Sequence, residues 1–181
     1  MITPGNPLLL IDGYNIIGTW TSLKRTRDRH GLESARRELV EALINYIAHS
    51  GYQARVVFDS QHRKTPSSLE KHSPNLSIHF TAWAQTADTY IEKVCASFFH
   101  RTSPTPPRLI VATSDRDQRL TVVGYGAEWM SAQHLANEID ISTYRVRQKQ
   151  QPSKRSQGRF LFNCLDAKSQ ARLTQWQQEK N

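Results

Sequence analysis

The sequence predicts an α/β fold in which helices cover both faces of a mostly parallel sheet. Three short apolar runs, at 8–11, 54–58 and 109–112, have the continuous hydrophobic pattern of strands that are buried on both faces. Segments with apolar residues at helical spacing separate these runs. Strands that alternate with helices form right-handed crossovers, which make the strands parallel. With 181 residues, the chain is long enough for one domain with a hydrophobic core.

The first half of the chain contains two of these strands and a long helix. The strands at 8–11 and 54–58 each run directly into an acidic residue. Between them, apolar side chains recur every three or four residues over 32–48, which predicts an amphipathic helix that ends near Gly51. Residues 60–75 are polar and contain two prolines, so we expect a long exposed loop there.

The second half continues the alternation of strands and helices. A strand is expected at 76–80, a helix at 87–99 and the third buried strand at 109–112. The remaining expected elements are a short helix at about 116–123, a strand at 128–130, a helix at 131–138 with Ser131 as its cap, and a final helix at 165–178.

The net charge of +8 lies almost entirely in the last fifth of the chain. Residues 1–144 carry 15 Lys and Arg against 14 Asp and Glu, a net of +1, whereas residues 145–181 carry 9 against 2, a net of +7. We therefore divide the chain into a domain at 1–144, a basic arm at 145–163 and a C-terminal helix at 164–181 that packs on the domain. A basic arm on a nearly neutral body favours binding to a polyanion. The alternative is a solvated tail that keeps the protein soluble.

Several classes of protein are excluded by composition. Cys95 and Cys164 are the only cysteines, so neither a disulfide framework nor a cysteine-rich zinc site is expected. No apolar run approaches the roughly 20 residues that span a bilayer. Residues 1–5 lack the basic and apolar regions of a secretory signal. We therefore expect a cytoplasmic protein in a reducing compartment.

Acidic residues follow all three buried strands. Asp12, Asp59 and Asp115 stand at or just beyond the strand ends, and the helix at 87–99 adds Asp88 and Glu92 on one face. In an open parallel sheet, functional groups gather outside the carboxyl ends of the strands. We therefore expect these carboxylates to meet in one cleft.

Clustered carboxylates repel one another unless a cation neutralises them. Oxygen ligands without cysteine or paired histidine favour Mg²⁺ or Mn²⁺ over zinc, and such an ion polarises a phosphate ester and activates water. Each acid also has an ordinary alternative: Asp12 suits a turn, Asp59 a strand-end cap and Asp88 a helix N-cap. The whole set on consecutive strand ends favours a metal site.

Three further polar residues lie next to these acids. Asn15 can orient a carboxylate, or it can serve as a cap or turn residue. The hydroxyl of Ser114 can meet a phosphate or a water ligand, or it can cap a helix. Asp117 can join the site, or it can stabilise the N-terminus of the helix at 116–123 through the helix dipole.

Four ordered motifs carry a resemblance to a known family. They are Ile11-Asp12-Gly13-Tyr14-Asn15, Val57-Phe58-Asp59, Thr86-Ala87-Asp88-Thr89-Tyr90-Ile91-Glu92 and Ala112-Thr113-Ser114-Asp115-Arg116-Asp117. Together they resemble the motif set of the NYN domain family, and within it the YacP-like branch of ribosome-associated endoribonucleases. The likeness extends to Leu165-Asp166 and so covers nearly the whole chain. It implies a PIN-like three-layer α/β/α fold and a Mg²⁺- or Mn²⁺-dependent site that cleaves single-stranded RNA.

The resemblance also implies roles for individual residues. Asp12, Asp88 and Asp115 would be the metal ligands, and Asn15, Glu92 and Asp117 would orient ligands or water around them. Asp59 also falls on a family strand end. The substrate implied is messenger RNA on or near the ribosome, and the basic arm suits docking on ribosomal RNA. The residues expected to bind RNA are Arg63, Lys64, Arg145, Arg147, Lys149, Lys154, Arg155 and Arg159.

The sequence thus predicts a metal-dependent endoribonuclease. The alternative is a non-catalytic RNA- or ribosome-binding module on the same fold, whose RNA binding would respond little to divalent ions or to loss of an acid. A phosphatase with an aspartyl nucleophile is disfavoured because Tyr14 stands where a second Asp would be needed. A dinucleotide-binding enzyme is disfavoured because the chain lacks a glycine-rich loop.

Overall fold

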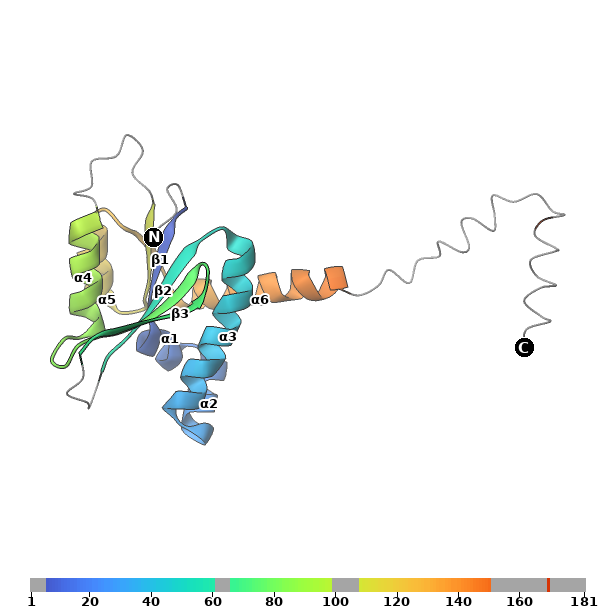
Figure 1. Cartoon of the computed structure of the whole chain (residues 1–181), viewed down its shortest axis with the longest axis horizontal. Coiled ribbons are helices and arrows are strands. Elements are labelled where there is room, and N and C mark those ends of the chain that lie inside the picture. The colour runs from blue at the N-terminus through green and yellow to red at the C-terminus, as the bar shows by residue number, and fades with distance from the viewer. Residues whose placement is uncertain (1–5, 61–65, 99–107, 151–168, 170–181) are drawn as a thin grey trace. The chain divides into compact units, whose positions relative to one another are not determined.

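A six-stranded sheet organises the protein (Figure 1). The computed structural model describes residues 6–60, 66–98, 108–150 and 169. Its elements are β1 (Leu8–Asp12), α1 (Gly13–Thr19), α2 (Thr21–His30), α3 (Leu32–Ser50), β2 (Gln53–Phe58), β3 (Ser68–Ser73), β4 (Leu76–Phe80), α4 (Ala87–Phe98), β5 (Leu109–Ala112), α5 (Arg116–Gly124), β6 (Glu128–Met130) and α6 (Ala132–Gln150). The predicted α/β fold class is confirmed.

The strand order is β3-β4-β2-β1-β5-β6, with β1 near the centre. β1 pairs in parallel with β2 and with β5, and the outer pairs β2·β4 and β5·β6 are also parallel. β3 runs antiparallel to β4. The carboxyl ends of the five parallel strands therefore lie along one edge of the sheet, which is where the site is built.

Alternate residues of the buried strands point to opposite faces, and each face has its own core. Leu9 and Ile11 of β1 pack with α1, α2, α3 and the first turns of α6. Leu8 and Leu10 pack with α4 and α5 on the other face. In Figure 1, α1–α3 accordingly lie on one side of the strands and α4 and α5 on the other. The three-layer arrangement has a physical cause: the strands are apolar on both faces and need cover on both.

Most of the expected elements are present, and three regions differ. Residues 60–75 were expected to be a loop, but they include β3, an edge strand whose side chains are largely exposed. Residues 13–30 form α1 and α2, for which no element was predicted. α6 continues to Gln150, twelve residues beyond the expected end at 138. Gly51 ends α3 with a left-handed φ of 74°, which glycine adopts without strain.

Two expected features lie outside the described residues: the arm beyond residue 150 and, apart from residue 169, the final helix at 165–178. Among the helices that are described, none is long and apolar enough to cross a membrane.

Candidate functional site

Four aspartates from different elements gather at the carboxyl ends of the parallel strands, and we call this group the acid edge. Asp12 ends β1, Asp59 follows β2, Asp115 follows β5 and Asp88 lies in the first turn of α4. Their charges interact: burial raises the pKa of Asp88 above its usual value, and the charges of Asp115, Asp59 and Glu92 raise it further. The structure therefore brings Glu92 within electrostatic reach of the same group.

Asp12 is the most enclosed member of the acid edge. Its side chain accepts a hydrogen bond from the backbone N–H of Asn15 at 3.2 Å, and the residue is only 8 % exposed. Burial raises the pKa of Asp12 to about 6, although the hydrogen bond from Asn15 lowers it. The negative charges of Asp88 and Asp59 raise this pKa further. A carboxylate in this position gains from any cation or proton that compensates its charge.

Gln118 of α5, which sequence analysis did not single out, connects Asp12 with Asp88. Its side-chain amide donates to Oδ1 of Asp88 and also hydrogen-bonds to Asp12. The residue is 3 % exposed, and its Oε1 has no hydrogen-bond partner among the described residues. The amide thus supplies the positive end of a dipole to two carboxylates that repel each other.

The spacing between Asp115 and Gln118 is a sequence signal that points to Gln118. Asp115 is the N-cap of α5 and Gln118 stands three residues later, the spacing of a capping box. In a capping box the Gln side chain would bond to the backbone N–H of the cap residue. Here Oγ1 of Thr113 accepts that N–H at 3.1 Å, which leaves the Gln118 side chain available to the carboxylates.

Asp115 and Asp59 each commit one oxygen to the start of a helix. Oδ1 of Asp115 accepts from the N–H groups of Asp117 and Gln118 at 2.8 and 3.0 Å. Oδ1 of Asp59 accepts from the N–H of Ala87, the first residue of α4. Asp115 is therefore the N-cap of α5, a role that was not expected for it, and Asp59 holds α4 against the strand end. Asp117 is exposed in the first turn of α5.

Asn15 and Ser114 link the chain segments around the acids. The side-chain oxygen of Asn15 accepts from the backbone N–H of Ser114 at 2.7 Å, which ties the start of α1 to the segment after β5. The hydroxyl of Ser114 accepts from the N–H of Ala132 at 3.2 Å and so caps α6. Ser131 also caps this helix through His134, as predicted.

The side chains of the acid edge offer carboxylate oxygens, the hard ligands that Mg²⁺ and Mn²⁺ prefer. Across the ranges that the structure describes, no group of three or more His, Cys, Asp or Glu side chains is arranged to hold a metal ion. Asp12 and Asp88 nevertheless present two hard carboxylates, bridged by one amide. Mg²⁺ is commonly bound by one or two carboxylates, with water and substrate phosphates as the other ligands. Asp115 as a third ligand stays a prediction.

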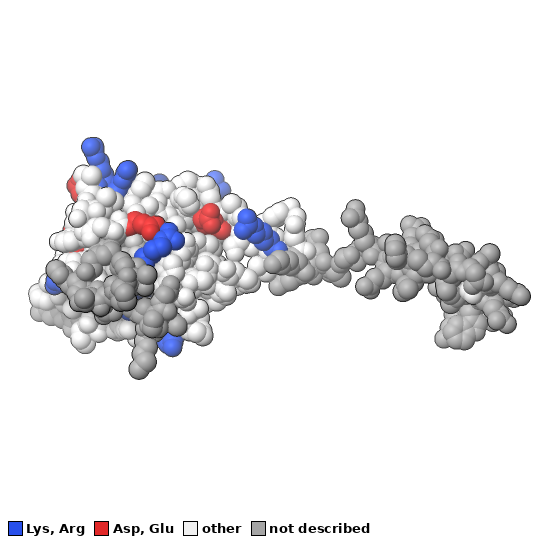
Figure 2. All heavy atoms as spheres, turned by 90° about the horizontal axis from the view of Figure 1, so that it is seen from above, with Lys and Arg blue, Asp and Glu red and all other residues white. Residues whose placement is uncertain are grey.

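The expected RNA-binding residues are only partly described. Arg145 and Arg147 are exposed on α6, and Lys149 belongs to the same helix. Arg63, Lys64, Lys154, Arg155 and Arg159 lie outside the described residues. Figure 2 shows acidic side chains next to basic ones on the face drawn there, in keeping with the near-neutral charge of residues 1–144.

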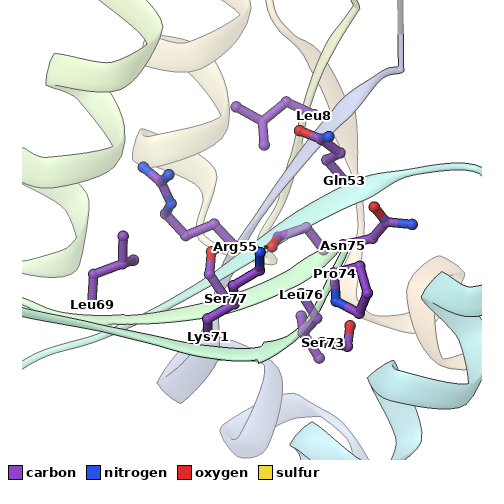
Figure 3. A pocket seen from close by; sticks show the side chains of 11 residues that line it. Leu8, Gln53, Arg55, Leu69, Lys71, Ser73, Pro74, Asn75, Leu76 and Ser77 are labelled. Carbon is purple, nitrogen blue, oxygen red and sulfur yellow. Dashed lines mark hydrogen bonds between the residues drawn. The ribbon is translucent and has the colours of Figure 1, made fainter. Parts of the chain in front are cut away.

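A cavity of about 180 Å³ lies at the other end of the strands (Figure 3). Its lining includes Leu8 and Gln53, the first residues of β1 and β2, together with Arg55 and Lys71. The guanidinium of Arg55 donates to the hydroxyl of Tyr90 at 2.7 Å. Because the cavity lies at the amino ends of the strands, it is separate from the acid edge.

Comparison with known proteins gives consistent results. Residues 9–178 match the model of the YacP-like NYN domain. The YacP protein of Bacillus subtilis is 33 % identical over 144 residues, which cover 78 % of this chain and 80 % of the relative. The crystal structure of Rae1 (YacP) from B. subtilis is 30 % identical, with a TM-score of 0.64 over 78 % of each chain. A tryptophan-to-leucine mutant of Rae1 gives the same identity and TM-score over 79 % of this chain and 80 % of the mutant.

Proposed function

Because the chain belongs to the YacP-like NYN domain family, which implies a nuclease-type, RNA-related function, we propose that it is a metal-dependent endoribonuclease. The observation that carries this proposal is the acid edge: Asp12 and Asp88 approach each other from different elements, and burial raises the pKa of both. Groups with perturbed pKa values gather at functional sites, and these two meet where the parallel strands end.

Asp12 and Asp88 would hold Mg²⁺ or Mn²⁺, and Asp115 would complete the set through the oxygen that does not cap α5. When bound, the ion supplies a Lewis acid for the phosphate group and for a water nucleophile. Glu92 and Asp117 would orient water around this position. Asn15 and Asp59 keep the surrounding segments in place through their hydrogen bonds to Ser114 and Ala87.

The proposed substrate is single-stranded RNA, with messenger RNA on or near the ribosome as the natural form. The chain supplies cations for a phosphate backbone: residues 145–181 alone carry a net charge of +7. Basic residues from 145 to 159, together with Arg63 and Lys64, would hold the RNA or dock on ribosomal RNA.

A second candidate is an RNA-binding module without catalysis. It is favoured by the hydrogen bonds that occupy Oδ1 of both Asp59 and Asp115, since these give the two acids a structural role. This candidate predicts RNA binding that divalent ions barely change, and no cleavage by the purified protein.

The test is cleavage of a labelled single-stranded RNA by the full chain and by Asp12→Asn, with Mg²⁺ or Mn²⁺ present. The variant keeps the shape and the acceptor oxygen of the side chain but removes its charge, so we expect cleavage to fall by about a hundredfold or more. Asp28→Asn is the matched control, because Asp28 is exposed on α2 and pairs with Arg27. Undiminished cleavage by folded Asp12→Asn would refute the assignment, and no cleavage by the wild-type chain would favour the binding module.

A further inference from the structure

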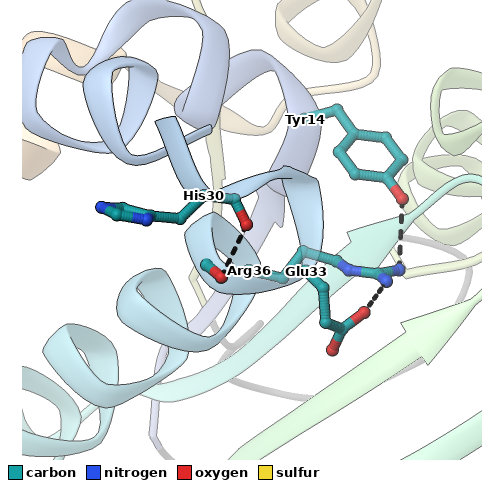
Figure 4. Close-up of polar contacts among 5 residues, drawn as sticks. Tyr14, His30, Glu33 and Arg36 are labelled. Atoms are coloured by element: carbon teal, nitrogen blue, oxygen red, sulfur yellow. Dashed lines mark hydrogen bonds and ion pairs between the residues drawn. The ribbon is translucent and has the colours of Figure 1, made fainter. Parts of the chain in front are cut away.

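Arg36 of α3 lies over the carboxyl ends of β2 and β4, where it meets Phe58 and Phe80, on the face of the sheet that α1–α3 cover. Figure 4 shows its guanidinium between two partners: it donates to the hydroxyl of Tyr14 at 3.3 Å and to the carboxylate of Glu33. The Arg36 side chain is 25 % exposed, and its Nε is buried without a hydrogen-bond partner in the described part of the chain.

Aromatic rings fix the position of this guanidinium. Its central carbon lies 5.9 Å from the ring centre of Phe58 and 5.7 Å from that of Phe80. Phe58 also packs on the ring of Tyr14, with centres 5.0 Å apart. Phe58 directly precedes Asp59, and Tyr14 stands two residues after Asp12. The cation therefore lies at the edge of the sheet where β1 and β2 end, the edge that carries Asp12 and Asp59.

Tyr14 connects the guanidinium with the first turn of α1, which begins directly after Asp12. Its hydroxyl accepts a hydrogen bond from Arg36, and its ring packs on Phe58, the last residue of β2. A phosphate bound by Arg36 would therefore lie at the same edge of the sheet as the carboxylates that we propose to act on RNA.

The present partner of Arg36 is easy to replace. The Glu33 side chain is 81 % exposed, and ion pairs between a guanidinium and an exposed carboxylate contribute little in water. A phosphate offers several oxygens to the planar fork of an arginine and forms stronger, charge-assisted hydrogen bonds. The rings keep the guanidinium in place when Glu33 leaves.

We propose that Arg36, oriented by Tyr14, binds a backbone phosphate of the RNA strand beside the acid edge, with the phosphate taking the place of Glu33. This subsite rests on the proposed RNA substrate and extends it, because it names the group that positions the strand. It lies in the described domain and is independent of the basic arm.

The test measures binding of a fluorescently labelled single-stranded RNA to the full chain in EDTA, so that cleavage does not interfere. We expect Arg36→Ala to weaken binding by about tenfold and to lower the slope of log Kd against log salt by about 0.7. Arg37→Ala is the matched control, because it removes the same charge from the next, exposed position of α3. It should change Kd by about twofold or less.

Glu33→Gln should change the Kd for RNA in the opposite direction from Arg36→Ala. If phosphate displaces Glu33, neutralising this carboxylate removes the competitor, and RNA binding should tighten by about two- to threefold. Arg36→Lys keeps the charge but loses the planar guanidinium. The slope of log Kd against log salt should therefore stay the same, while Kd rises. These two variants test the subsite even if Arg36→Ala fails to fold.

Equal effects of Arg36→Ala and Arg37→Ala, or weaker binding by Glu33→Gln, would overturn the subsite. Cleavage separates this outcome from the nuclease proposal. If Asp12→Asn abolishes cleavage while Arg36→Ala binds RNA like Arg37→Ala, the nuclease stands and the subsite is wrong. If the wild-type chain does not cleave RNA while Arg36→Ala alone loses binding, the subsite stands and the nuclease is wrong.

Discussion

Asp12 and Gln118 together show how single side chains make the acid edge possible. Gln118 donates one amide to carboxylates from β1 and α4, so it reduces their repulsion without adding a charge. The compensation is incomplete, since the pKa of Asp12 is still raised to about 6, with burial as the main cause. Asp12 therefore opposes folding when it is ionised, and this gives a prediction that needs no RNA and no metal.

The stability of the metal-free protein should fall as pH rises through the pKa of Asp12. The folded chain binds this proton more tightly than the unfolded chain, whose ordinary pKa is 3.8, so the stabilisation is fully present below pH 3.8 and is lost as pH rises through about 6. The loss by pH 7 is about 3 kcal/mol. Asp12→Asn removes it, and the variant should be more stable than wild type at pH 7.

Urea unfolding at pH 4 and at pH 7 measures this difference. The advantage of Asp12→Asn over wild type should be present at pH 7 and small at pH 4. Asp28→Asn should follow wild type at both values, because Asp28 is exposed. A constant difference between Asp12→Asn and wild type at the two pH values would contradict the prediction.

Among whole elements, those buried on two faces were predictable and those with little apolar surface were not. β1 and β5 are continuous apolar runs because α-helical layers cover both of their faces. β3 has exposed side chains at the sheet edge, and α2 buries only Leu23, so neither shows a clear apolar period. These two elements are stabilised by pairing and packing with neighbouring elements, so the local sequence pattern does not reveal them.

The same distinction applies to the candidate site. The convergence of Asp12, Asp59 and Asp115 could be predicted, because parallel strands end at one edge of a sheet. Gln118 and Arg36 could not be, since their importance depends on which way a helical side chain points across to another element. The capping box after Asp115 marks Gln118 only as a helix residue.

The packing of α1 on β2 makes the two glycines of α1 respond differently to substitution. A Cβ at Gly13 would lie 2.2 Å from the ring of Phe58, which is fully buried. A Cβ at Gly18 would meet nothing within 4 Å. Gly13→Ala should therefore lower the free energy of unfolding by about 2 kcal/mol, while Gly18→Ala should raise it by about 0.5–1 kcal/mol.

Urea unfolding of both alanine variants is the measurement, and each serves as the control for the other. The substitution is the same and the helix is the same, so helix propensity cancels from the comparison. Equal effects would mean that Phe58 can move away from the start of α1. That result would also weaken the argument that the rings hold Arg36 in a fixed place.

For the molecule as a whole, the uneven distribution of charge predicts which basic residues govern RNA binding. Residues 1–144 are nearly neutral and residues 145–181 carry +7. Each phosphate neutralised on a single strand contributes about 0.7 to the slope of log Kd against log salt, because it releases counterions. Replacing Arg145, Arg147 and Lys149 of α6 with glutamine should therefore lower the slope by about 2 if all three contact phosphate.

A matched variant replaces Lys24, Arg25 and Arg29 of α2 with glutamine. These three residues are exposed and helical, and their replacement removes the same charge from the other part of the chain. Binding of a labelled single-stranded RNA at several salt concentrations should show a much smaller change of slope for this variant. If it loses as much slope as the α6 variant, net charge alone attracts the RNA, and the basic residues of α6 have no particular role in holding it.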